Sequence, residues 1–270
     1  MEGWARAVRT DIMQTLLLND DVNSRHLRFH SAANQSSPSK IRALKIALLC
    51  LGTLIISFAP LEARPQRAMI ALTFDDGPYP VETGLLLDVL AELRVPATFF
   101  LIGHDTEMYP GLAKRIVADG HEIANHTQTH PARFDALSPS GVKSELDLGA
   151  ATLERYVRDP AIRTMMRPPH GRFTEATVTA AQADGYHVIL WNDDPGDWRS
   201  VDASAIDKHM EENATAPDIV LLHSGRLNTV EALPSIVARF RAAGFTFVTV
   251  GQLLARVPAR EIVHPAKLRV

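Results

Sequence analysis

The sequence predicts a parallel α/β fold, and three observations support that expectation. The chain has 270 residues, which suits one large α/β domain or two small ones with an ample core. Its composition, 46% hydrophobic and 22% charged, is that of an ordinary globular protein and excludes disordered and fibrous classes. From residue 68 onward, short apolar runs alternate with helix-like stretches, which is the pattern of a parallel sheet with crossover helices.

The first part of this region contains three predicted strands. The run 69–74 is apolar apart from one threonine and predicts a buried strand. Leucines form a broad apolar face over 81–93, which predicts a helix that a proline then ends, and 97–103 predicts the second strand. A helix over 108–119, closed by a glycine, leads to a short predicted strand at 121–124.

The second part continues the alternation with four further strands. Strands are expected at 164–166, 187–191, 219–222 and 245–250. Helices are expected at 140–157, 175–183, 203–212 and 230–243. Two of these helices are followed within two residues by a glycine, which is typical of helix C-termini. The tail after Val257 carries no readable signal.

Residues 40–63 have the profile of a secretory signal. Basic residues precede a 13-residue apolar run, 46–58, and Ala63 offers a small residue at a candidate cleavage point. An uncleaved membrane anchor over 46–61 and a buried core helix are the alternatives. We therefore expect an exported protein, periplasmic, in the cell envelope or secreted. Residues 1–39 are either an overlong start or a polar, flexible cytoplasmic tail.

The charge distribution limits which partners are expected, and the cysteine content bears on lipidation and export. Residues 1–45 hold seven Lys/Arg and four Asp/Glu, whereas residues 64–270 hold 21 and 26. The region 64–270 is thus mildly acidic. It lacks the excess of Lys and Arg that binds a phosphate backbone, so nucleic acid is not an expected partner. The single cysteine, Cys50, follows a leucine too large for the usual lipoprotein pattern, and we do not expect it to be lipidated. A cysteine-free domain is compatible with export.

Reactive side chains recur directly after the predicted strands. Because the carboxyl ends of parallel strands share one face, these five groups should converge there. They lie at 75–76, 125–131, 167–171, 192–198 and 223–225.

Asp75 and Asp76 close the first predicted strand. Neighbouring side chains in a strand point to opposite faces, but the turn at Gly77-Pro78 would end that alternation and let both carboxylates face one pocket. Two like charges cannot be buried together without a cation or a shared proton. A bare surface Asp-Asp turn is the alternative.

His126 and His130 are four residues apart, so a helical turn would put both imidazoles on one face. That spacing alone is weak. Asp76, from another strand end, can supply a third ligand. Two histidines and one carboxylate leave a coordination position open for water, as catalytic zinc sites do.

Four further residues can be interpreted either as structural or as functional. Arg167 is either a structural or surface arginine, or the group that holds a base carboxylate ionised and oriented. His223 is either a core histidine or, paired with Asp197, a general acid. Trp198 and Trp191 fit the core better than they fit a sugar platform.

In order, these motifs resemble the polysaccharide deacetylases of carbohydrate esterase family four, the NodB-type homology domain. The resemblance covers residues 68–256 of a domain at 64–270 and rests on five motifs in the family's order: Thr73–Pro78, His126–His130, Arg167–Gly171, Asp194–Trp198 and Leu221–His223. It implies a distorted, incomplete (β/α) barrel of about seven parallel strands and a divalent metal ion, usually zinc.

The resemblance also implies roles. Asp75 resembles the general base, Arg167 its partner, and His223 the general acid tuned by Asp197. The implied metal ligands are Asp76, His126 and His130. The backbone N–H at His170 would help to hold the oxyanion, although most members have Tyr there, and Trp198 belongs to the substrate groove.

The implied reaction is hydrolysis of an N-acetyl group on an amino sugar of a polysaccharide or oligosaccharide, with release of acetate. Asp75 would deprotonate the attacking water, and His223 would protonate the departing amine. An N-acetylated glycan is therefore the expected partner, with membrane contact only through 46–61 if that segment is uncleaved. Two alternatives remain: a hydrolase of a small amide, imide or O-acetyl ester with the same fold, and a non-catalytic glycan-binding relative.

Overall fold

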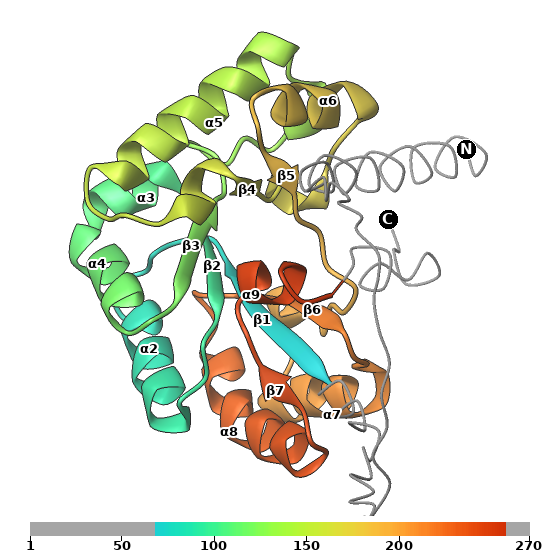
Figure 1. Ribbon diagram of the computed structural model, residues 1–270. Helices are drawn as coiled ribbons and strands as arrows, with labels where there is room; N and C mark the ends of the chain where they lie inside the picture. Colours follow the sequence, from blue (N-terminus) through green and yellow to red (C-terminus); the bar gives the residue numbers. More distant parts are fainter. Residues whose placement is uncertain (1–67, 258–270) are drawn as a thin grey trace, which may run out of the picture.

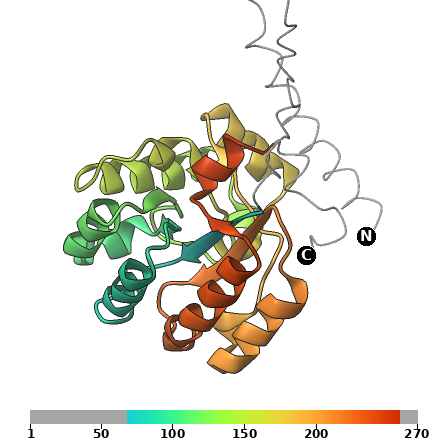
Figure 2. The ribbon, with the colours of Figure 1, turned by 60° about the horizontal axis from the view of Figure 1, so that its bottom comes forward.

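The computed structural model describes residues 68–257. Within this range the chain forms a seven-stranded sheet of order β5-β4-β3-β2-β1-β6, with β7 paired to β1, and every pairing is parallel. The longer helices lie around the outside of the curved sheet (Figure 1), and a second view shows them as an arc about the strands (Figure 2). The predicted incomplete (β/α) barrel is therefore confirmed.

The strands are short except for β1 and β6, which are adjacent in the sheet. The strands are β1 (Met69–Asp75), β2 (Thr98–Leu101), β3 (Glu122–Asn125), β4 (Met165–Met166), β5 (His187–Val188), β6 (Asp218–His223) and β7 (Thr246–Phe247). The long pair is β1 and β6, which match residue for residue from Ile70 and Asp218 to Asp75 and His223.

The helices follow the strands in the expected alternation. They are α2 (Glu82–Leu93), α3 (Gly103–Met108), α4 (Pro110–Ala118), α5 (Pro139–Glu154), α6 (Glu175–Ala183), α7 (Ala203–Asn213), α8 (Leu227–Ala242) and α9 (Val250–Leu254). None of the helices in the described part of the chain is long and apolar enough to cross a membrane.

The two faces of β1 pack against different layers. Ile70, Leu72 and Phe74 belong to the large core between the sheet and the helices. Met69 and Ala71 belong to a second core inside the curve of the sheet, where Phe100 also lies. Because side chains alternate along a strand, Asp75 falls on the same inner face.

Two edges of the curved sheet meet beyond β5. The segment after β5 reaches β6, where Asp193 forms an isolated parallel bridge with Val220. The N–H of Asn192 donates to the carbonyl of Ile219 at 3.1 Å, and the N–H of Leu221 donates to the carbonyl of Asp193 at 2.9 Å. The barrel is distorted here because the ladder is broken between Val188 and this bridge.

Several predicted bounds were wrong. The strand expected at 187–191 ends at Val188. The helix expected over 108–119 is α4, Pro110–Ala118, and a further helix that was not expected, α3, precedes it at Gly103–Met108. The strand expected at 245–250 is only Thr246–Phe247, because Thr249 caps a short helix, α9, in a capping box with Gln252. α9 contributes Val250 and Leu253 to the inner core. The segments 1–39 and 40–63, for which a tail and a signal are expected, lie outside the described residues.

Candidate active site

The structure brings the polar strand-end residues together at the carboxyl edge of the sheet. Asp75 is the last residue of β1 and His223 the last of β6. His126 directly follows β3, and Arg167 directly follows β4. β6 and β1 are adjacent in the sheet, as are β3 and β4, and β2 lies between the two pairs. Because all these strands are parallel, their carboxyl ends lie at the same edge of the sheet.

Asp75 and Arg167 form a buried ion pair. Nη1 of Arg167 donates to Oδ1 of Asp75 at 2.6 Å and to the hydroxyl oxygen of Thr73 at 2.8 Å. Both charged side chains are buried, Arg167 completely. Because the guanidinium occupies Oδ1, the second oxygen, Oδ2, is the one that faces His126, at 3.8 Å from its Nε2.

Arg167 is also bound by the backbone and by aromatic rings. Its Nε donates to the carbonyl of Ile189 at 3.1 Å and its Nη2 to the carbonyl of Leu190 at 3.2 Å. The guanidinium lies over the rings of Phe100, at 4.1 Å, and Trp191, at 5.5 Å. Burial lowers the pKa of Arg167, and the neighbouring Asp75 opposes that shift. A surface role for this arginine is excluded.

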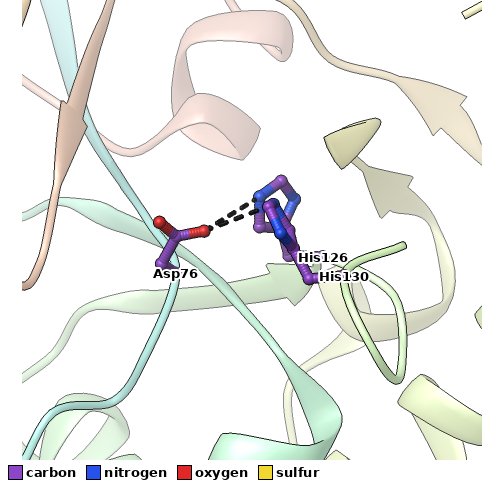
Figure 3. A group of neighbouring side chains, drawn as sticks. All are labelled: Asp76, His126 and His130. Atoms are coloured by element: carbon purple, nitrogen blue, oxygen red, sulfur yellow. Dashed lines mark ion pairs between the residues drawn. The ribbon is translucent and has the colours of Figure 1, made fainter. Parts of the chain in front are cut away.

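Asp76, His126 and His130 form the one group of potential metal ligands found among residues 68–257, and Figure 3 shows both imidazoles directed at the carboxylate. Oδ1 of Asp76 lies 3.5 Å from Nε2 of His126 and 3.4 Å from Nε2 of His130. Tetrahedral zinc with bonds of about 2.0–2.1 Å places neighbouring donors roughly 3.3 Å apart. The spacing and the donor set therefore fit a divalent ion such as zinc.

The tautomer of His126 is set by its second nitrogen. Nδ1 lies 2.9 Å from the backbone carbonyl of Arg167, and because a carbonyl only accepts, Nδ1 carries the proton. Nε2 is thereby left as the ligand atom, an arrangement common among metal-binding histidines. The carbonyl of Arg167 thus orients a candidate metal ligand, while its side chain binds the candidate base.

The charges of these three groups are coupled. Burial opposes the charged form of His126, but Asp75 and Asp76 outweigh it and raise the pKa of His126. Burial and the charge of His126 lower the pKa of His130 to about 4. Burial would raise the pKa of Asp76, yet the hydrogen bond and charge of His126 and the charge of His130 hold that pKa well below its ordinary value.

The two histidines lie on a loop and not on a helical turn. Thr127 and His130 both have left-handed backbones, with φ of 71° and 53°. Each such residue costs roughly 1–2 kcal/mol in an L-amino acid. Local side chains compensate: Oδ1 of Asn125 accepts the N–H of Thr127 at 2.8 Å, and the hydroxyl of Thr127 accepts the N–H of His130 at 3.0 Å.

His223 forms a second buried pair, with Asp197. Nδ1 of His223 donates to Oδ1 of Asp197 at 2.8 Å, and the backbone N–H of His223 donates to Oδ2 at 2.8 Å. The hydroxyl of Thr229 also donates to Oδ2, at 2.7 Å, so the fully buried carboxylate accepts three hydrogen bonds. Burial opposes protonation of His223, but the hydrogen bond and charge of Asp197, with the charges of Asp75 and Asp76, raise its pKa.

Ser224 ties the strand end that carries His223 to the strand end that carries the two aspartates. Its N–H donates to the carbonyl of Asp75 at 3.0 Å, and its hydroxyl donates to the carbonyl of Asp76 at 3.0 Å. A Cβ at Gly77, which has φ of 70°, would lie 2.8 Å from the Ser224 hydroxyl oxygen. Glycine is therefore required for the turn after Asp76 on both counts.

The sequence is similar to those of known proteins. The family model described as "Polysaccharide deacetylase" matches residues 62–189. A peptidoglycan-N-acetylglucosamine deacetylase of Bacillus cereus is 40% identical over 200 residues, which is 72% of this chain and 91% of the relative. A chitooligosaccharide deacetylase of Bradyrhizobium is 36% identical over 198 residues, covering 68% of this chain and 90% of the relative.

A solved structure of a relative has a similar fold. The crystal structure of the Bc1960 peptidoglycan N-acetylglucosamine deacetylase superimposes with a TM-score of 0.67 at 30% identity, covering 72% of this chain and 91% of that one. The chain belongs to the polysaccharide deacetylase family. The predicted family and the prediction of an N-deacetylase hydrolase are thereby confirmed.

Two further residues expected from the family lie beside His130 and Asp197. His170, where most members of the family have Tyr, is exposed, has a left-handed backbone with φ of 55°, and places its ring 4.6 Å from that of His130. Trp198 follows Asp197 directly and is 45% exposed, with Arg199 over its ring at 4.5 Å. The core interpretation of Trp198 was wrong, whereas Trp191 does pack against the inner core.

Sequence reasoning missed residues that act through others. Thr229 completes the bonds to Asp197 from α8, and Thr73 accepts from Arg167 while donating to the carbonyl of Val220 at 2.6 Å. Thr73 begins the first of the family motifs, so a signal existed for it. Thr229 lies in an ordinary helical stretch and carries no local signal.

Proposed function

We propose that this protein removes N-acetyl groups from amino sugars of a glycan, releasing acetate and leaving a free amine. The observation that carries the proposal is the placement of a carboxylate, Asp75, and an imidazole, His223, beside the candidate metal ligands. Asp75 and His223 are direct partners in the register of β1 and β6. A base and an acid on either side of one point are what amide hydrolysis requires.

Asp76, His126 and His130 are the residues that would hold a divalent ion, and we propose zinc. Imidazole and carboxylate donors suit it, and three protein ligands leave a position open. When bound, the ion supplies Lewis acidity toward water and toward the acetyl oxygen. Since His126 has a raised pKa, an ion bound here would compete with a proton on that residue.

Asp75 is proposed as the general base. Its Oδ1 is bound by Arg167, so Oδ2, which lies 3.8 Å from Nε2 of His126, is the oxygen that would take the proton of the attacking water. Arg167 fixes the carboxylate in one orientation through a charge-assisted hydrogen bond. Arg167 itself donates to two backbone carbonyls, which fix the guanidinium and with it the carboxylate of Asp75.

His223 is proposed as the general acid. Its Nδ1–H is bound to Asp197, which leaves Nε2 as the nitrogen that would deliver a proton to the departing amine. An amine is a poor leaving group until it is protonated, so this step is required for an amide. The raised pKa of His223 keeps the acid protonated to higher pH than an ordinary histidine would be.

The relatives favour a glycan as substrate. Their names give peptidoglycan N-acetylglucosamine in Bacillus cereus and chitooligosaccharides in Bradyrhizobium. An exposed aromatic ring suits stacking on a sugar, and Trp198 offers one directly beside Asp197. We propose a substrate groove that includes Trp198, with the backbone N–H of His170 as an oxyanion donor.

The deciding experiment is acetate release from a panel of acetylated substrates. The panel contains peptidoglycan, chitin oligomers, an O-acetylated xylan and small N-acetyl amides, each assayed with and without a chelator and after zinc is restored. We expect chelator-sensitive release from at least one N-acetylated glycan. Release only from the O-acetyl or small amide substrates would make the protein a different hydrolase of this fold, and glycan binding without release would make it a binding module.

A further inference from the structure

We propose that Glu145, on α5, is a positioning residue that holds the His126–His130 loop in the shape that directs both imidazoles at Asp76. Glu145 lies outside the strands and outside the motifs shared with the family. The inference rests on the proposed metal site, because the loop matters through the ion that its histidines would bind.

The carboxylate of Glu145 is bound to the loop by three hydrogen bonds. Its Oε2 accepts the backbone N–H groups of Gln128, at 3.1 Å, and Thr129, at 2.9 Å. Its Oε1 accepts the hydroxyl of Thr129 at 2.8 Å. The backbone carbonyl of Glu145 also accepts the N–H of Gln128 at 3.1 Å. Residues 68–257 form many ion pairs, and in none of them does Glu145 take part.

The loop needs such a support because of its backbone. Gln128 and Thr129 lie between Thr127 and His130, the two residues with left-handed φ. Backbones of this kind persist only where the surroundings fix them. The carbonyls of Thr127 and Gln128 are held from α3, by the N–H groups of Gly103 at 3.0 Å and His104 at 2.9 Å. Glu145 supplies the complementary acceptors from α5.

α5 also packs on the loop directly, through a glycine. A Cβ at Gly149 would lie 2.9 Å from the carbonyl carbon of Thr127 and 3.1 Å from the nitrogen of Gln128. This close approach, one helical turn from Glu145, brings the carboxylate within reach of the loop amides. α5 therefore supports the loop that carries His126 and His130.

The test compares Glu145→Ala and Glu145→Gln in the full chain. The zinc dissociation constant is measured by competition with a chromophoric chelator, and the melting temperature of the metal-free protein is measured alongside. We expect Glu145→Ala to weaken zinc binding by roughly 10–100-fold, the usual effect of losing a partner that orients ligands. Glu145→Gln should bind zinc within about threefold of wild type, because its amide oxygen can accept both N–H groups and its NH2 can donate to the Thr129 hydroxyl.

Glu154→Ala is the matched control. Glu154 lies on the same helix and forms a two-point ion pair with Arg163, at 2.8 and 2.7 Å, away from the loop. It should leave zinc affinity unchanged. Thr129→Val, which removes one of the three bonds, tests the same contact with less risk to folding. It should weaken zinc binding in the wild-type background and have no further effect in Glu145→Ala.

Three results would overturn the inference. Wild-type zinc affinity in Glu145→Ala would do so, as would equal losses in Glu145→Ala and Glu154→Ala. Undiminished affinity in Thr129→Val would show that the contact does not orient the histidines. A wild-type protein that binds no zinc would remove the proposed metal site as well, so the two failures can be told apart.

Discussion

Asp75 and His223 lie directly opposite each other at the carboxyl ends of β1 and β6. These strands form the longest continuous pairing in the described part of the sheet, six residues in register. The separation of the proposed base and acid is therefore fixed by backbone hydrogen bonds and not by a flexible loop. Ser224 reinforces it with bonds to the carbonyls of Asp75 and Asp76. A site built on paired strands is well suited to hold two groups at a constant distance.

The proposed metal ligands provide the first test. His126→Ala should abolish both stoichiometric zinc binding and N-deacetylation, because it removes one of three ligands and the one whose tautomer is fixed by the Arg167 carbonyl. Metal content by mass spectrometry and acetate release are the measurements. His187→Ala, at an exposed position on β5, is the control and should change neither. A double variant, His126→Ala with His130→Ala, that still retained one zinc per chain would refute the assignment.

The role of His223 can be separated from metal binding by the choice of leaving group. His223→Ala should bind zinc normally and lose roughly 10²–10⁴-fold in kcat on an N-acetyl substrate. It should lose much less on an activated acetyl ester, whose leaving group departs without a proton.

The control for that experiment is His209→Ala. His209 also pairs with a buried aspartate, Asp193, at 2.7 Å, but lies on α7. It should leave both substrates unaffected. Equal and unchanged rates of His223→Ala on amide and ester would make His223 a core histidine, and the mechanism would lack its acid.

The pH dependence of amide hydrolysis should depend on Asp197. In the wild type the raised pKa of His223 keeps the acid loaded until the pH rises through that value. Asp197→Asn removes the negative charge that favours the imidazolium, so the pKa of His223 should fall and the alkaline limb of kcat/KM should move to lower pH. Asp193→Asn serves as the comparison and should not move it. An alkaline limb that stays in place in Asp197→Asn would show that His223 does not govern it.

Arg167 should be needed for stability as well as for activity. Arg167→Met leaves the carboxylate of Asp75 buried without its partner, which typically costs about 3–5 kcal/mol of unfolding free energy. Arg163→Met removes an exposed ion pair with Glu154 and should cost about 0–1 kcal/mol. Urea unfolding of both variants is the measurement. A loss below 1 kcal/mol in Arg167→Met would mean that the pair contributes little to the fold.

We also propose that the domain is exported, because the basic and apolar pattern of residues 40–63 is that of a signal. A reporter that is active only outside the cytoplasm, fused after Gln66, should be active. The same fusion with Leu48, Leu49 and Leu51 changed to Glu should be inactive. Activity confined to a cytoplasmic reporter would contradict export. Cleavage near Ala63 is a separate question, answered by N-terminal sequencing of the mature protein.

The order of strands and helices could be predicted from the sequence because apolar runs and amphipathic stretches are local patterns. The shortness of β5 could not, because Ile189 and Leu190 are as apolar as strand residues, yet their carbonyls bind Arg167 from another strand. α9 was missed because Val248 and Val250 prolong an apolar run, while the cap at Thr249 begins a helix.

The residues of the candidate site could be predicted from the sequence where they belong to a local motif. Asp75 and Asp76 follow an apolar run and stand beside a Gly-Pro turn, so their chemistry is visible locally. Glu145 and Thr229 act across the fold, through single contacts from helices, and nothing in their neighbourhoods distinguishes them from solvated helix residues. Only the packing of the helices against the strand ends reveals them.

Arg167 closes a gap in the barrel wall with the same guanidinium that binds Asp75. One side chain thus serves architecture and chemistry at once, and selection for either preserves it. A descendant of this protein that abandoned catalysis would be free to lose His223 or a metal ligand. The arginine would still be needed for the fold. Inactive members of such a lineage should therefore lack His223 or a proposed metal ligand and retain the arginine.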